Sequence, residues 1–127
     1  MKHYLNKNEE AVMQIIWRLE KAFLKEIAEE FPEPKPPYTT IASVVKKLEK
    51  NGLIGFRSFG KTHRYFAILQ QKEYSGSSLK NILHNYFGGS YEQLVSFFMK
   101  EEELDIKELE KIYNNLKSKH PNDDGIL

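Results

Sequence analysis

The stretch YTTIASVVKKLEKNG, residues 38–52, most constrains the fold of this chain. Its apolar residues recur at i, i+3, i+4 and i+7, which places them on one face of a helix. The opposite face carries small hydroxyl side chains first and lysines after them, and Asn51-Gly52 supplies a helix stop. Such a face can bring short side chains near base edges and lysines near phosphates. The plain alternative is a surface helix with solvated lysines.

The charge distribution favours the first interpretation. Residues 35–72 hold 8 basic residues against the single acid Glu49. Residues 1–72 hold 13 Lys/Arg and 8 Asp/Glu, a balance of +5, whereas residues 73–127 hold 6 and 10, a balance of −4. A basic front and an acidic back predict that the front meets a polyanion.

Two further helices are predicted ahead of residue 38. The first covers residues 7–21, and Asn6 and Glu9 have the spacing of a capping box at its start. The second covers residues 24–31 and is cut by Pro32. The PEPKPP run that follows cannot be helix interior, because each proline removes an amide donor and restricts the residue before it. We interpret this run as a stiff connector between helices.

After Gly52 the pattern changes to that of a β-hairpin. Residues 53–59 and 63–69 are rich in aromatic and branched side chains, and Gly60-Lys61-Thr62 separates them. Basic residues should cluster near the hairpin tip. Three helices followed by a basic hairpin is the order of a winged helix-turn-helix, in which the third helix enters the major groove and the hairpin reaches the neighbouring backbone.

The expected fold class is therefore mainly α, an α+β winged helix-turn-helix over residues 1–72. The lysines and arginines of its third helix and hairpin should contact phosphates, and the small hydroxyl side chains should read bases. The predicted DNA-binding residues are Thr39, Thr40, Ser43, Lys46, Lys47, Lys50, Arg57, Lys61 and Arg64.

The back of the chain predicts a three-helix dimerisation segment over residues 73–118, followed by a flexible tail, residues 119–127. Ser75, Ser77 and Ser78 fall in an expected linker, and three amphipathic helices follow it. So much apolar surface on a short segment predicts burial against a second copy, and packing back on the front domain is the alternative. The predicted dimerisation residues are Leu79, Leu83, Tyr86, Phe87, Leu94, Phe97, Phe98, Leu109, Ile112, Tyr113 and Leu116.

Several classes of function are disfavoured. The chain has no cysteine, and its four histidines fall in four different predicted elements without metal-ligand spacing. No nucleophile motif or phosphate-binding glycine loop is present, so we expect no enzyme, no metal site and no cofactor. No apolar run approaches a membrane span, and the N-terminus lacks a signal pattern. We expect no membrane insertion and a cytoplasmic location.

With these features the sequence resembles the penicillinase-repressor (BlaI/MecI-type) family of winged-helix regulators. The resemblance is carried by LNKNEEAVMQIIW (5–17), TTIASVVKKLEKNGLI (39–54), the GKTHRY hairpin segment (60–65) and a helical C-terminal segment of the right length. It covers about residues 4 to 118. Winged helices share pieces of these motifs, but their combination is characteristic of the family.

The resemblance implies a homodimeric repressor that binds a palindromic operator, dimerises through its C-terminal helices and controls genes of the antibiotic-resistance type. Ala42 stands where relatives often have a longer polar residue, so the resemblance does not imply the same operator sequence. The positions that match family DNA contacts are Thr39, Thr40, Ser43, Lys47 and Lys61.

The resemblance also implies a mode of release. Family members are cut before a phenylalanine by a protease that a membrane sensor activates, and the corresponding bond here is Ser96-Phe97. The best-known targets have Asn where this chain has Ser. The alternative is that Phe97 is packed dimer core. Copper sensing of the kind that uses C-terminal cysteines is excluded, because the chain has none.

Two other functions stay open at this point. Winged helices also serve as protein-interaction adaptors, and the acidic helical back could be the working surface. A small-molecule-responsive regulator is also conceivable, with a pocket among Tyr86, Phe87, Tyr91 and Phe98.

Overall fold

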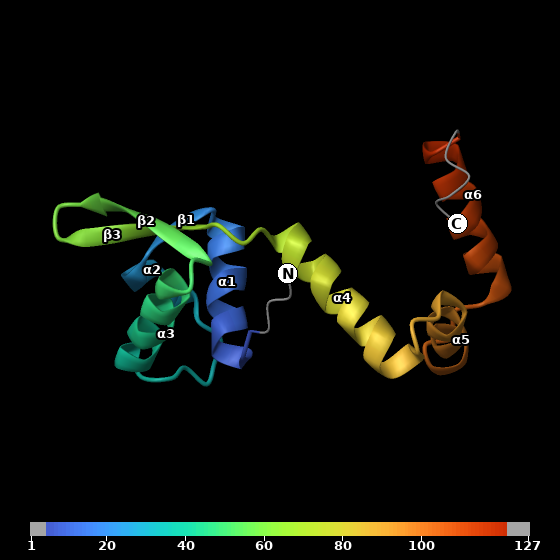
Figure 1. The fold of residues 1–127 in the computed structure, drawn as a ribbon, viewed down its shortest axis with the longest axis horizontal. Coiled ribbons are helices and arrows are strands. Elements are labelled where there is room, and N and C mark those ends of the chain that lie inside the picture. The colour runs from blue at the N-terminus through green and yellow to red at the C-terminus, as the bar shows by residue number, and fades with distance from the viewer. Residues whose placement is uncertain (1–4, 122–127) are drawn as a thin grey trace. The chain divides into compact units, whose positions relative to one another are not determined.

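The structure, a computed structural model, describes residues 5–121. Its contacts divide the chain into a first unit up to Leu79 and a second unit from Lys80. Figure 1 shows the helices and the small sheet that confirm the predicted mainly α, α+β winged-helix fold. The elements are α1 (Lys7–Leu19), β1 (Lys21–Phe23), α2 (Leu24–Glu30), α3 (Tyr38–Lys50), β2 (Ile54–Phe59), β3 (Thr62–Ala67), α4 (Gln71–Phe87), α5 (Tyr91–Glu101) and α6 (Ile106–Lys119).

Helix α1 begins with the capping box that the sequence predicts. The Asn6 side chain accepts a hydrogen bond from the Glu9 amide at 2.8 Å, and the Glu9 carboxylate accepts one from the Asn6 amide at 2.8 Å. Two otherwise unpaired amides at the helix start are satisfied in this way. The helix ends at Leu19, two residues earlier than predicted, because Glu20 adopts a φ of +69°.

The residues after this break form a strand that the sequence did not predict. Strand β1 pairs antiparallel with β3, with Ala22 opposite Tyr65, and the sheet order is β1-β3-β2. A strand of three residues shows no periodicity, so only the partner strand, more than 40 residues further along the chain, defines it. Residue 21 therefore belongs to the sheet and not to the first helix.

Helix α3 packs its apolar stripe into the core as predicted. Ile41, Val45 and Leu48 are at most 2% exposed. Its end is a Schellman motif, in which the Leu53 amide donates to the Leu48 carbonyl and the Gly52 amide to the Glu49 carbonyl. Gly52 has a φ of +78°, a backbone conformation that a side chain would strain.

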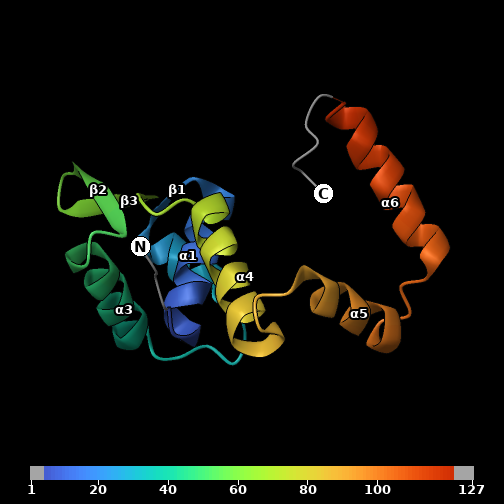
Figure 2. The same ribbon diagram turned by 45° about the vertical axis from the view of Figure 1, so that its right-hand side comes forward.

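The core of the first unit is formed by one face of each helix and the inner face of the sheet. Figure 1 shows α1, α2 and α3 gathered beside the sheet, and Figure 2 shows α1 and α3 there from a second side. Burying these side chains removes apolar surface from water and dominates the stability of the unit. The buried side chains are Val12, Met13, Ile15, Ile16, Ala22, Ile27, Phe31, Ile41, Val45, Leu48, Ile54, Tyr65 and Leu69.

Helix α4 begins at Gln71, so the predicted linker around Ser75 is wrong. Its first turn is anchored to α1, because the Tyr74 hydroxyl donates to the Glu10 carboxylate at 2.8 Å. The Tyr74 ring lies 5.8 Å from that of Trp17, whose indole N–H donates to the Leu69 carbonyl at 2.8 Å. These contacts hold a serine- and glycine-containing segment in a helix that its composition disfavours.

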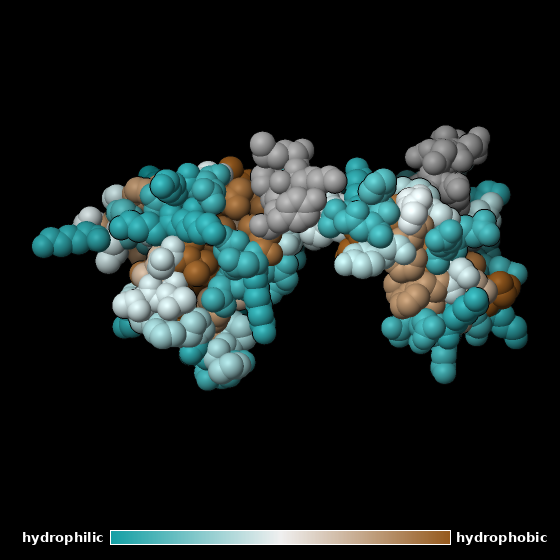
Figure 3. Space-filling view, turned by 60° about the horizontal axis from the view of Figure 1, so that its bottom comes forward, coloured by the Kyte–Doolittle hydropathy of each residue, from teal (hydrophilic) through white to brown (hydrophobic). Residues whose placement is uncertain are grey.

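The helices of the second unit have N-capping side chains but bury few of their residues. The Ser90 hydroxyl accepts from the Gln93 amide, and the Asp105 carboxylate accepts from the Glu108 amide. Among their described residues, α5 and α6 have no buried side chain, and Leu83 is the buried residue of α4. Figure 3 shows hydrophobic side chains at the surface of this unit, to the right of the view. Helix α6 includes Lys119, and the predicted tail beyond residue 121 lies outside the described residues.

Candidate nucleic-acid interface

The side chains predicted to read bases lie on the outer face of α3. Thr39 and Ser43 are exposed, and Thr40 is half-buried one residue before the core residue Ile41. All three fall in the first two turns of the helix. Thr39 and Ser43 face away from the buried stripe, whereas Thr40 lies at its edge, one turn before the half-buried Val44. Short side chains on the exposed N-terminal turns of such a helix permit a close approach to base edges.

The start of α3 is also suited to a phosphate. Its N-cap is Pro37, no side chain caps this end, and the first turn contains no acid. The positive end of the helix dipole is thus open to an external anion. Tyr38, which begins the helix, is 54% exposed. Tyr38 was not among the predicted DNA-binding residues, although the sequence shows that the proline before it offers no N-capping side chain.

The lysines of α3 do not all have the same surroundings. Lys46 and Lys50 are exposed and enter no ion pair within residues 5–121. The amine of Lys47 lies 3.3 Å from the carboxylate of Glu9, whose side chain is only 8% exposed. Lys47 therefore joins the recognition helix to the capping box of α1, a role that the sequence did not reveal.

The hairpin brings its basic residues to two different places. Lys61 is exposed in the two-residue turn, where Gly60 has a φ of +64°. Arg57 and Arg64 face each other across β2 and β3, three residue pairs from the turn. The predicted cluster at the tip is therefore spread along the strands.

Arg64 is further held by its neighbours. Its guanidinium carbon lies 5.7 Å from the centre of the Phe23 ring, within the range of a cation–π contact. Its Nε atom is buried and has no hydrogen-bond partner among the described residues. Because the side chain lies on β1, it has less freedom to reach DNA than Arg57 does.

The other face of the hairpin is stiffened by aromatic contacts. The Phe56 and His63 rings stack with centroids 3.9 Å apart, and Tyr65 lies about 6 Å from both. Burial raises the pKa of the Tyr65 hydroxyl above 10.0, and the nearby Glu49 and Tyr38 raise it further. Tyr65 therefore stays neutral at ordinary pH, and its ring packs with the stacked pair on this face of the hairpin.

A three-helix unit with an exposed basic recognition helix and a basic hairpin defines a winged-helix DNA-binding regulator. Within residues 5–121, no helix is long and apolar enough to cross a membrane. In that same range, no group of three or more His, Cys, Asp or Glu side chains is arranged to hold a metal ion.

Residues 5–118 match the penicillinase repressor family, and the chain belongs to that family. Its members are transcriptional regulators and not enzymes. The methicillin resistance regulatory protein MecI of Staphylococcus aureus strain N315 is 28% identical over 109 residues, which are 85% of this chain and 89% of that protein. The penicillinase repressor of Staphylococcus aureus is 29% identical over 102 residues, 80% of this chain and 81% of that protein. The chain is a DNA-binding transcriptional repressor.

Proposed function

We propose that the protein binds a palindromic operator as a homodimer and represses genes of the antibiotic-resistance type. One recognition helix would enter each major-groove half-site, with half-sites about one helical turn or a small multiple apart. Occupying a promoter excludes polymerase, so repression needs no chemistry of its own. The action on resistance genes follows the names of the relatives, one a methicillin resistance regulator and the other a penicillinase repressor. A DNA-bound repressor works beside the chromosome, and we propose a cytoplasmic location.

The observation that carries the DNA-binding part of this proposal is the exposure of lysines without an ion pair among the described residues, on two elements of the first unit. Lys46 and Lys50 on α3 and Lys61 in the hairpin turn are exposed on the same unit as Thr39 and Ser43. Lysines at these positions would contact phosphates and position the helix, while the hydroxyl side chains would contact bases. The protein-interaction adaptor would need no such concentration of cations.

The DNA-binding part is tested by selecting random duplex DNA with the purified full chain, while the mass of the protein in solution is recorded. A palindromic consensus bound by a dimer is expected, and log K should fall linearly with log salt. Enrichment of no sequence would overturn the repressor proposal and favour the adaptor.

The dimerisation part of the proposal is supported by exposed apolar side chains on the second unit. Tyr86 is 78% exposed, and Phe97, Phe98, Ile112 and Tyr113 are each 42–46% exposed in the single chain. Exposed apolar side chains at this density typically mark an interaction site. A second copy is the occupant that the symmetry of a palindrome requires, since a two-fold operator matches a two-fold protein. A monomer in solution at micromolar concentration would contradict this part.

The same surface bears on the small-molecule alternative. Tyr86 and Tyr91 are 78% and 73% exposed, whereas the ring of Phe87 lies 5.5 Å from that of Phe97 in an edge contact. Two of the four aromatic residues proposed as a ligand pocket therefore lie largely in solvent in the single chain. Dimer burial remains the better interpretation of these side chains.

Relief of repression by proteolysis is a further part of the proposal, with a membrane sensor protease as the partner. The bond would be Ser96-Phe97, which lies inside α5. Ser96 is half-buried and Phe97 is 42% exposed, so a protease would need local unwinding of the helix to bind the bond in an extended form. Incubation with the activated sensor of the host should give two fragments that meet at this bond. An intact chain would restrict Phe97 to a packing role.

A further inference from the structure

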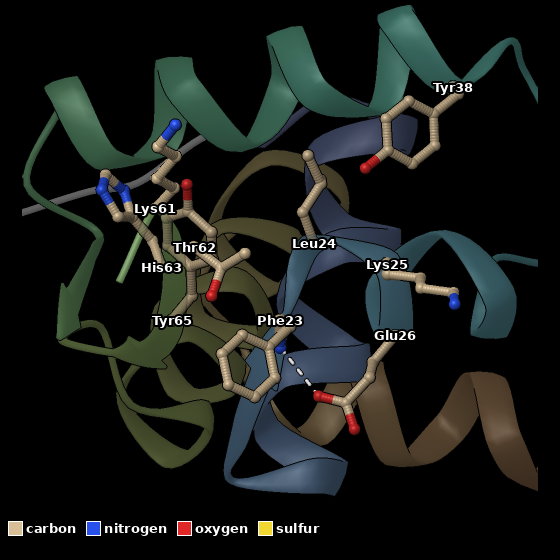
Figure 4. Close-up of a pocket in the computed structure, with 9 residues that line it drawn as sticks. All are labelled: Phe23, Leu24, Lys25, Glu26, Tyr38, Lys61, Thr62, His63 and Tyr65. Carbon is tan, nitrogen blue, oxygen red and sulfur yellow. Dashed lines mark hydrogen bonds between the residues drawn. The ribbon is translucent and has the colours of Figure 1, made fainter. Parts of the chain in front are cut away.

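A groove of about 580 Å³ lies in the first unit between the hairpin and the two helices of the DNA-binding motif. Figure 4 shows its walls, which come from β3, from the junction of β1 with α2 and from the first turn of α3. The volume is within the range of small-ligand sites, about 300 to 1,000 Å³.

The walls of the groove are largely apolar. Phe23 and Leu24 are half-buried, and the rings of Tyr38 and Tyr65 stand on either side of Leu24 in Figure 4. An aromatic or aliphatic body placed here would lose water-exposed area against carbon on several sides, which favours binding.

Tyr65 presents an unsatisfied donor to this groove. The residue is only 9% exposed, and its hydroxyl has no hydrogen-bond partner among residues 5–121. The hydroxyl is not among the fully buried side-chain atoms, so it reaches the groove surface and is free to donate a hydrogen bond to an acceptor on a ligand. The raised pKa of Tyr65 keeps the hydroxyl protonated and therefore able to donate.

The lining carries two lysines, Lys25 and Lys61, against the single acid Glu26, which favours a negative ligand. Glu49, whose charge raises the pKa of Tyr65, is not part of the lining. Lys61 and Tyr65 both line the groove, as Figure 4 shows, and Lys61 enters no ion pair within the described residues. The acid of the lining, Glu26, already accepts a hydrogen bond from the Phe23 amide at 2.8 Å. A groove lined by a donor hydroxyl and a free ammonium suits a carboxylate.

We propose that this groove binds a small organic carboxylate with an apolar body. The carboxylate accepts hydrogen bonds from the Tyr65 hydroxyl and the Lys61 amine, while the body packs on Phe23 and Leu24. Because Lys61 and the exposed Tyr38 also belong to the surface that faces DNA, the ligand lowers DNA affinity. That last step rests on the proposed function, whereas the binding itself does not.

The first experiment titrates the full chain with 2-naphthoate and, as a matched neutral probe, with 2-naphthamide, followed by amide NMR shifts. Naphthoate should bind about tenfold or more tightly than the amide, as expected for a charge-assisted hydrogen bond. The shifts should centre on residues 23–26, 38 and 61–65. Equal affinities for acid and amide, or shifts confined to residues 80–121, would overturn the binding proposal.

The variants Tyr65→Phe and Lys61→Gln should each weaken naphthoate about fivefold or more. Lys100→Gln, on an exposed position of α5, is the control and should bind as the unaltered protein does. Tyr65→Phe removes only an unpartnered hydroxyl, so its denaturation midpoint should be unchanged. Unaltered naphthoate affinity in Tyr65→Phe would overturn the assignment of the hydroxyl.

Competition is measured separately, by fluorescence anisotropy of a duplex that the selection experiment identifies. Saturating naphthoate should lower DNA affinity about tenfold, and the effect should be lost in Tyr65→Phe. Unchanged DNA affinity at saturation would overturn the effector role. A protein that binds naphthoate but selects no DNA would refute the proposed repressor function and leave the binding site established.

Discussion

The pair formed by Glu9 and Lys47 offers a sharp test of how the recognition helix is held. The Glu9 side chain is 8% exposed and that of Lys47 61%, with 3.3 Å between amine and carboxylate. Glu9 also closes the capping box by accepting from the Asn6 amide. Removing Glu9 should therefore have two separable costs, one for the cap and one for the ion pair.

The magnitudes follow from these surroundings. Losing a capping hydrogen bond costs about 1 kcal/mol, and a half-exposed ion pair contributes about 1 kcal/mol, between the values for surface and buried pairs. Glu9→Ala should lose about 2 kcal/mol of unfolding free energy. Glu9→Gln retains an acceptor for the Asn6 amide and should lose about 1 kcal/mol. Lys47→Met leaves the buried Glu9 carboxylate without its cation and should also lose about 1 kcal/mol of unfolding free energy.

The assay is urea unfolding of Glu9→Gln, Lys47→Met and the double variant, combined in a double-mutant cycle. A coupling free energy of about 1 kcal/mol is expected. Arg18 and Glu30, 2.9 Å apart with side chains 55% and 44% exposed, form the matched control pair, which should couple by about 0.3 kcal/mol. A Glu9–Lys47 coupling no larger than that of the control would refute the bracing role.

Three further predictions follow from the geometry. Lys61→Ala should weaken binding to all DNA sequences alike and lower the salt slope by about 1, whereas Thr40→Ala should relax discrimination at one base pair. Binding to matched and mismatched duplexes at several salt concentrations would measure both effects. An unchanged sequence preference in Thr40→Ala would show that Thr40 does not contact bases. Ile112→Lys places a charge in the proposed interface, so it should raise the dimer dissociation constant at least about tenfold in sedimentation equilibrium. The melting of the first unit should be unaltered, and Lys111→Ala is the control. Burial, and then the hydrogen bond to Glu10, raise the pKa of Tyr74 above 10.0. The stability that Tyr74 contributes is present below pH 10 and is lost as pH rises through the raised pKa. Between about pH 8 and pH 11, Tyr74→Phe should therefore lose less unfolding free energy in urea than the unaltered chain does. Equal losses in the two proteins would contradict this.

Much of the first unit could be predicted because its signals are local. The stripe of Ile41, Val45 and Leu48 repeats at the helical period, and each member is buried. The capping box at Asn6 and Glu9 is a matter of spacing, and so is the hairpin turn at Gly60. The Gly52 stop needs only the permissive backbone of glycine.

Where prediction failed, distant contacts overrode local preference. β1 exists because β3 offers it a partner, and the turn composition around Ser75 forms helix because Tyr74 docks on Trp17 and Glu10. No window of neighbouring residues contains this information, since the partners are separated by more than 40 positions in the chain.

The candidate interface divides in the same way. The sequence alone determined which residue types face outward on α3 and that the basic residues concentrate before residue 73, because periodicity and charge are properties of the chain. Only the tertiary structure decided that Lys47 pairs with Glu9 and that Arg64 lies over Phe23. It also decided that the side chain of Tyr65, whose hydroxyl has no partner within residues 5–121, lines a groove. Those features depend on which side chains meet when separate elements pack, and a buried charge or hydroxyl takes its properties from the neighbours that packing brings to it.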